Sequence, residues 1–166
     1  MKYEMDMETD FAENLLQSIP TLPRSAIRSL EEASVSRKYR SRDVIIREGQ
    51  PSGGIFLLIA GGAHQSLSVA NCARREVLSL PDISAPAVLG TASCMLGEPS
   101  PLTISTSAPT QAVFIPQHNF MNVLRKFPQA GLAMSQLLSE ELAQIYGRLA
   151  ELRGAATLQR PPSLLN

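Results

Sequence analysis

The amino-acid sequence predicts a mainly β domain with flanking helices, a double-stranded β-helix jelly roll that ends in a long C-terminal helix. Three observations predict this class. The middle of the chain, 36–116, alternates short apolar or β-branched runs with glycine and proline turns, as sandwiches and barrels do. Apolar residues at helical spacing lie on both sides of it. The 166 residues suit one domain with its own core.

Composition excludes several classes of function. Net charge is zero, with 15 basic and 15 acidic residues, so the chain as a whole attracts neither DNA nor an anionic membrane. The longest apolar run, 55–60, is too short to span a bilayer, and the acidic N-terminus, 1–10, which we expect to be flexible, lacks the apolar stretch of a signal peptide. We therefore expect a cytoplasmic protein with no direct DNA or membrane binding. Cys72 and Cys94 form no metal motif and are interpreted as structural thiols, with a redox pair as the alternative.

Residues 11–33 predict two N-terminal helices. The first has apolar residues at helical spacing: Phe11, Leu15 and Leu16. Pro20 and Pro23 then break the chain, and Ser25 is expected to cap the second helix.

Short strands follow, separated by turn signals. The predicted strands are 44–46, 55–60, 63–69, 76–80, 103–107 and 112–115. Glycines mark turns at 48–54 and 61–62, and a hairpin tip is expected at 71–75.

Two helices are predicted at the C-terminal end. The first is 117–127, which Pro128 interrupts, and the second is a long helix at 129–153. Its apolar residues are separated by four, three, four and three positions, the spacing of a helix–helix seam: Leu138, Leu142, Ile145, Leu149 and Leu152. This face either packs on its own β-roll or pairs with a second chain, and the regular spacing favours a homodimer. Gly154 is expected to end the helix, leaving 154–166 as a disordered tail.

This order of elements resembles the effector domain of the catabolite activator protein and fumarate–nitrate regulator (Crp/Fnr) family. The resemblance covers roughly 12–153 and is carried by short strings in the same order: 19–23, 44–50, 55–61, 88–90, 112–116 and 120–128. It implies a cyclic-nucleotide-binding-like β-roll over 11–128 and a dimerisation helix over 129–153.

The resemblance also implies a ligand site inside the roll. In such domains a loop carries a glycine, a glutamate for the ribose hydroxyl, a short helix, and an arginine for the cyclic phosphate. Gly90 matches the glycine, but Thr91 stands in place of the glutamate and Ser100 in place of the arginine. The candidate ligand residues are Gly90, Thr91, Ala92, Ser93, Ser100, Pro101, Leu102 and Thr103, with Gln144 and Tyr146 in second rank.

This loop is degenerate because no Lys or Arg occurs between Arg75 and Arg125. Loss of a charged hydrogen bond to a buried anion costs on the order of 1.5–3 kcal/mol, which is roughly a tenfold to several-hundredfold loss of affinity. Cyclic AMP and cyclic GMP are the ligands that the resemblance suggests, and we expect their binding to be weak or absent. A less charged ligand, or a surface loop without any ligand, are the alternatives.

Other candidate sites have simpler interpretations. His64 and His118 are too few for a metal-binding roll, and no metal site is predicted. The pairs Glu31-Glu32 and Glu140-Glu141 are adjacent on helices and indicate solvated surface. The basic cluster 37–47 is a solvated strand face or, alternatively, a nucleic-acid patch. Since no nucleophile motif is present either, the sequence does not predict an enzyme.

The sequence therefore predicts a stand-alone sensor domain that regulates transcription or signalling through a partner. The residues after Gly154 are too few for a helix-turn-helix, so we expect the DNA-reading domain to be absent. Partners would be a second copy, a full-length relative in a mixed dimer, or a signalling protein. The alternative is an interaction module with a closed pocket and no ligand.

Overall fold

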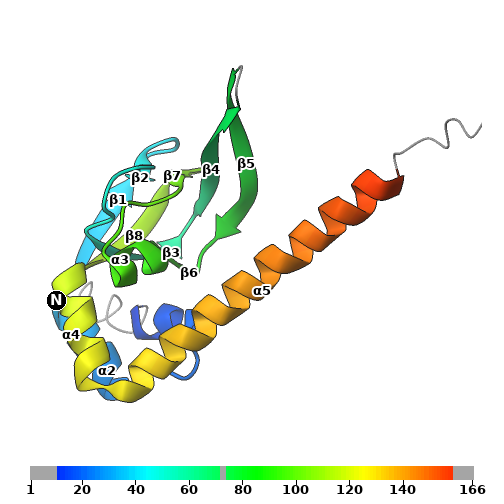
Figure 1. Ribbon diagram of the computed structural model, residues 1–166. Coiled ribbons are helices and arrows are strands. Elements are labelled where there is room, and N and C mark those ends of the chain that lie inside the picture. Colours follow the sequence, from blue (N-terminus) through cyan, green and yellow to red (C-terminus); the bar gives the residue numbers. More distant parts are fainter. Residues whose placement is uncertain (1–10, 72–73, 159–166) are drawn as a thin grey trace, which may run out of the picture.

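Two four-stranded antiparallel sheets face each other at the centre of the molecule (Figure 1). The computed structural model describes residues 11–71 and 74–158. The sheets have the strand orders β1-β8-β3-β6 and β2-β7-β4-β5. The strands are β1 (Val35–Tyr39), β2 (Val44–Ile46), β3 (Gly54–Ala60), β4 (Gly62–Asn71), β5 (Arg74–Ser84), β6 (Ala87–Leu89), β7 (Thr103–Thr106) and β8 (Thr110–Pro116). The predicted jelly roll is confirmed.

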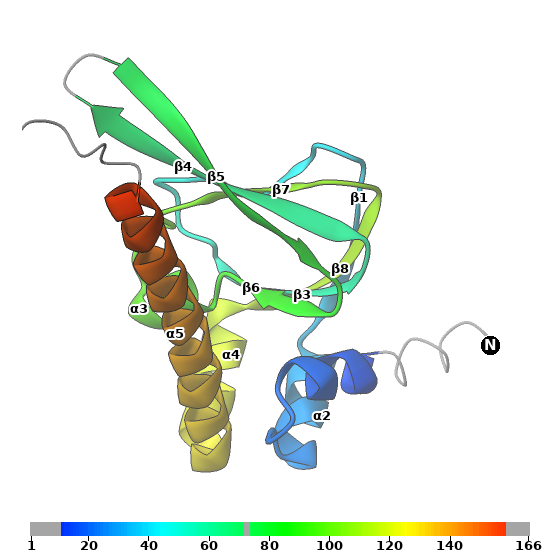
Figure 2. The same cartoon turned by 90° about the vertical axis from the view of Figure 1, so that its right-hand side faces the viewer.

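Helices precede and follow the strands of the roll in the sequence. Residues 11–18 are helical, and the other helices are α2 (Arg24–Glu32), α3 (Thr91–Leu96), α4 (Gln117–Lys126) and α5 (Pro128–Leu158). The long helix α5 is the largest of them, as Figure 2 shows from the side. Within the described residues, no helix is both long and apolar enough to cross a membrane.

Strand β3 explains why the molecule has two apolar clusters. Successive side chains of a strand point to opposite faces. Ile55 and Leu57 therefore join the helices, while Phe56 and Leu58 point between the sheets. All four side chains are buried, so the strand is apolar on both faces. This is why 55–60 reads as an uninterrupted apolar run.

The turn between β3 and β4 requires glycine. Gly61 has a φ of +89°, a left-handed conformation that costs side-chain-bearing residues energy. A Cβ atom there would lie 2.7 Å from the carbonyl oxygen of Pro109. The predicted turn at 61–62 is confirmed.

Two sequence-based expectations about helix ends are wrong. Ser25 does not cap α2, because the helix already begins at Arg24, with Pro23 at the cap position and no side-chain cap. Gly154 does not end α5, which continues to Leu158, so the tail expected at 154–166 begins inside the helix. Residues 159–166 and 1–10 lie outside the described residues. Glycine costs only about 1 kcal/mol inside a helix relative to alanine, and the alanines at 155 and 156 favour continuation.

The boundary between α4 and α5 agrees with the sequence. Phe127 is not helical, and Pro128 is the first residue of α5. Proline is well suited to this position, since its fixed φ fits a helix and its missing N–H would have no partner in the first turn.

Candidate functional site

The candidate ligand loop begins at a glycine that the fold requires. Gly90 has a φ of +79° and stands at the N-terminal end of α3. A Cβ atom here would lie 2.9 Å from Cδ1 of Ile46 and 3.2 Å from the carbonyl oxygen of Gly54. The loop backbone thus runs close against the wall of the roll.

Most hydroxyl groups of the loop form hydrogen bonds with backbone atoms of this chain. Ser93 Oγ donates to the carbonyl of Glu98 at 2.5 Å. Ser100 Oγ donates to the carbonyl of Leu102 at 2.8 Å and accepts from its N–H at 3.2 Å. Thr103 Oγ1 accepts from the N–H of Glu48 at 3.1 Å. These contacts hold the loop in shape and leave the hydroxyls less available to a ligand.

Thr91 is different. Its side chain is only 3% exposed, and its Oγ1 has no hydrogen-bond partner among the described residues. An unsatisfied buried hydroxyl costs free energy unless water or a ligand bonds to it. Thr91 thus carries a loop hydroxyl that makes no hydrogen bond among the described residues.

Backbone hydrogen bonds tie the loop to the turn before β3. The N–H of Gly49 donates to the carbonyl of Ser100 at 2.8 Å, and the N–H of Ser100 donates to the carbonyl of Gln50 at 2.9 Å. Ser100 is itself buried, Leu102 packs against the cluster inside the roll, and Ala92 and Pro101 are exposed. The predicted loop residues thus belong to one segment, but no cationic side chain lies in it.

The interior of the roll carries an aromatic pair with a cation above it. The rings of Phe56 and Phe114 have centroids 4.9 Å apart. The guanidinium carbon of Arg37 lies 4.1 Å from the centroid of Phe114 and 5.7 Å from that of Phe56. Arg37 is exposed, in agreement with the predicted solvated strand face. Its contact with the two rings was not predicted from the sequence.

The predicted helix seam is exposed where the structure describes it. Leu142 is 48% exposed and Ile145 54%, and every residue of 139–147 is exposed. At Leu142 and Ile145, α5 therefore does not pack on its own roll. Leu138 is half-buried, and the side chains of Leu149 and Leu152 lie outside the described part of the chain.

The second-rank pocket candidates are on the same exposed stretch. Tyr146 is 62% exposed and Gln144 is exposed. In the part of the chain that the structure describes, no hydrogen bond joins either side chain to the loop at Gly90.

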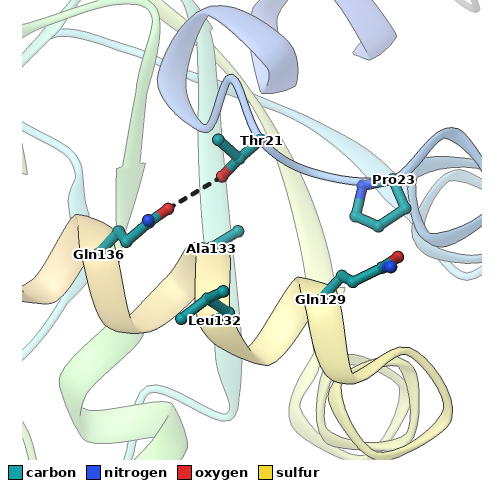
Figure 3. Close-up of a pocket in the computed structure, with 6 residues that line it drawn as sticks. All are labelled: Thr21, Pro23, Gln129, Leu132, Ala133 and Gln136. Carbon is teal, nitrogen blue, oxygen red and sulfur yellow. Dashed lines mark hydrogen bonds between the residues drawn. The ribbon is translucent and has the colours of Figure 1, made fainter.

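Two surface grooves lie outside the roll. One of about 350 Å³ separates the 19–23 turn from α5, and Thr21 Oγ1 donates across it to Gln136 Oε1 at 3.2 Å (Figure 3). Its lining residues are Thr21, Pro23, Gln129, Leu132, Ala133 and Gln136. The other, about 400 Å³, separates α3 from α4 and includes His118. Sequence reasoning did not find them because their walls come from separate elements.

The ion pair in the described part of the chain joins a histidine to an aspartate. His64 Nδ1 and Asp82 Oδ1 lie 2.7 Å apart on exposed strand positions. Burial raises the pKa of Cys94 to about 11, which keeps its thiol protonated at neutral pH. Within 11–71 and 74–158, no three His, Cys, Asp or Glu residues are grouped closely enough to hold a metal ion.

Comparison with known proteins agrees with the fold. The sequence pattern of the cyclic nucleotide-binding domain matches residues 36–127. The chain belongs to this family. No curated protein matches the chain.

Solved structures share the fold at low sequence identity. The Thermus thermophilus catabolite activator protein has a TM-score of 0.68 at 14% identity, over 80% of this chain and 61% of that one. A cyclic nucleotide-binding domain from Methylobacillus flagellatus has a TM-score of 0.68 at 16% identity, over 97% of this chain and 86% of that one. The sensor domain of the transcriptional regulator DNR from Pseudomonas aeruginosa has a TM-score of 0.62 at 15% identity, over 99% and 100%. This chain therefore spans less than two thirds of the catabolite activator protein and all of the sensor domain.

Proposed function

We propose that this chain is a cytoplasmic, homodimeric sensor domain that pairs through α5 and regulates transcription or signalling through a partner protein. The exposed stretch 139–147 carries this proposal. It presents Leu142, Ile145 and Tyr146 to solvent on a helix that continues to Leu158. Burial of such side chains contributes roughly 1.5–3 kcal/mol each. A second copy of the same helix supplies a matching apolar face.

The oligomeric state tests this proposal. Size-exclusion chromatography with light scattering at tens of micromolar should give twice the 18.0 kDa chain mass. Leu142→Glu and Ile145→Glu should each weaken pairing by roughly a hundredfold or more, because a two-fold interface would bury two unpaired carboxylates. Gln144→Glu is the matched control, since it adds the same charge beside the seam. A wild-type chain that stays monomeric at this concentration contradicts the proposal.

We further propose that cyclic AMP and cyclic GMP bind weakly or not at all. The loop has no cation for the phosphate, and the hydroxyls of Ser93 and Ser100 are bonded within the loop. Calorimetry should therefore detect no saturable binding of either nucleotide with a dissociation constant below about 100 micromolar. Saturable binding below that value would contradict this part of the proposal.

A second candidate function is an interaction module without any ligand. It is favoured by the filled interior of the roll, where Phe56, Leu58 and Leu89 are 2%, 0% and 3% exposed. A ligand of another class would enter this interior only if these side chains moved. A thermal-shift screen of nucleotides and small metabolites separates the two candidates, because a ligand that binds the folded state raises the melting temperature.

A further inference from the structure

Arg37 lies on the inner face of the roll, although it belongs to an edge strand. It pairs in register with Ala112 of β8, and Ala112 pairs with Leu58 of β3. Cross-strand partners point to the same face of a sheet. Since Ala112 and Leu58 belong to the cluster between the sheets, the side chain of Arg37 starts from that same face.

The guanidinium group is held over aromatic rings. It lies 4.1 Å from the centroid of Phe114 and 5.7 Å from that of Phe56. A guanidinium group within about 6 Å of a ring centroid is attracted by the ring, and this contact uses none of its N–H donors. The aromatic pair therefore fixes the cation in place without using its hydrogen-bonding capacity.

In the part of the chain that the structure describes, no carboxylate or carbonyl uses these donors. Among the described residues, the ion pair is that of His64 with Asp82, and no hydrogen bond from Arg37 is present. Arginine has five N–H donors in a fork that matches the two oxygens of a phosphate or carboxylate. Residue 37 is exposed, so an anion can approach from solvent.

The turn before β3 lies against the same aromatic ring. The segment 52–54 passes the outer end of the same ring: a Cβ atom at Gly53 would lie 4.0 Å from Cζ of Phe114. Ser52, at the start of this segment, has a buried hydroxyl oxygen without a partner among the described residues. The Cβ atom of Ser52 also lies 3.4 Å from the Cβ position of Gly90. Arg37 thus stands on the side of the roll where the candidate loop begins.

We propose that Arg37, stacked on Phe114 at the edge of the roll, forms a binding site for a small oxyanion, a phosphate or carboxylate group. This site goes beyond the proposed pairing through α5 and does not depend on it. Its cation comes from β1, so it is independent of the loop positions that lack charge.

A purely structural role for Arg37 makes a different prediction. If the side chain only covers the ring of Phe114, its removal lowers stability but anions have no specific effect. Titration of the wild-type chain therefore tests the proposal without any variant. We would follow the guanidinium Nε–H and the ring protons of Phe56 and Phe114 by NMR at constant ionic strength. Inorganic phosphate and acetate are the probes, and chloride is the reference.

Phosphate or acetate should produce saturable shifts at Arg37 and the two rings, with a midpoint below about 10 mM. A response to phosphate alone would identify the site as one for phosphate groups. Arg37→Ala should abolish the shifts at the rings. Lys38→Ala is the matched control, because it removes the same charge from the neighbouring residue of β1, whose side chain starts from the opposite face.

Linear, unsaturated shifts with both probes would overturn the proposal. An equal loss of response in Lys38→Ala and Arg37→Ala would also overturn it, since diffuse surface charge would then explain the effect. Neither result bears on the oligomeric state, so failure here is distinguishable from failure of the proposed dimer.

Discussion

The two parts of α5 differ in what covers them. In the first turns, Ala130, Ala133 and Met134 are 0%, 2% and 0% exposed and join the cluster beneath the outer face of the β1-β8-β3-β6 sheet. From 139 to 147 every residue is exposed, including Leu142 and Ile145. Apolar residues recur in both parts. Helical periodicity therefore predicts that a helix has an apolar face. It does not predict whether that face packs on its own chain, because this depends on how far the helix extends beyond the core.

The largest effect on stability is expected from side-chain truncation in the buried part of α5, compared with the same kind of truncation in its exposed part. Met134→Ala should lower the free energy of unfolding by about 2–5 kcal/mol, because it leaves a cavity in the core. Leu142→Ala should change it by less than about 0.5 kcal/mol in dilute solution, where the chain is monomeric. Urea denaturation measures both values.

Measurements at higher protein concentration test whether a second chain covers the exposed part of α5. Dimerisation stabilises the folded state by mass action, so the wild type should gain stability with concentration and Leu142→Ala should gain less. Equal destabilisation by the two truncations in dilute solution would mean that the far part of α5 is covered by its own chain.

The elements with a strong local signal could be predicted from the sequence. The apolar run 55–60, the glycine turn at 61–62 and the break at Pro128 all depend on neighbouring residues, and all are confirmed. The short edge strands β1 and β6 were not predicted individually. Their pairing partners lie far away in the sequence: Val35 pairs with Phe114, and Val88 with Leu57.

The candidate site also combines features that could be predicted from the sequence with features that depend on the three-dimensional fold. Gly90 was predicted as the loop glycine, because the resemblance fixed its position, and its φ is positive. The hydrogen bonds of Ser93 and Ser100 to loop carbonyls could not be predicted, since they depend on the three-dimensional course of the loop. The position of Arg37 over Phe114 required the register of β1 against β8.

Two glycine-to-alanine substitutions, one at a closely packed position and one at an exposed position, should have opposite effects on stability. Gly90→Ala should cost about 1–3 kcal/mol from its positive φ alone, and its Cβ would also contact Ile46 at 2.9 Å. Gly147→Ala lies in the exposed part of α5 with nothing within 4 Å of its Cβ. It should stabilise the chain by up to about 1 kcal/mol through helix propensity. Thermal denaturation of both variants tests the opposite signs, and a destabilised Gly147→Ala would indicate that this face is closely packed.

Restoring the charged residues of the loop should have a smaller effect. Thr91→Glu together with Ser100→Arg should raise the affinity for cyclic AMP by roughly tenfold or more, about 1.4 kcal/mol. The reason is that the arginine supplies the missing counter-charge and the glutamate an acceptor for the ribose. Calorimetry measures the change, and Thr91→Gln with Ser100→Gln is the uncharged control. If the charged pair gains no more than this control, then the filled interior, and not the missing charge, excludes the nucleotide.

The smallest effect is expected in the β1–β2 turn, which is exposed like the far part of α5 but carries strain. Arg42 has a φ of +71°, and its N–H donates to the carbonyl of Thr106 at 2.9 Å. Glycine keeps this hydrogen bond and removes the steric cost of a Cβ in the left-handed region, but it also makes the unfolded chain more flexible. Arg42→Gly should therefore raise the free energy of unfolding by no more than about 1 kcal/mol. Arg42→Ala removes the same charge and keeps the Cβ, so it should give no such gain. If both variants gain equally, relief of charge repulsion within the basic cluster, and not backbone strain, limits the stability of this turn.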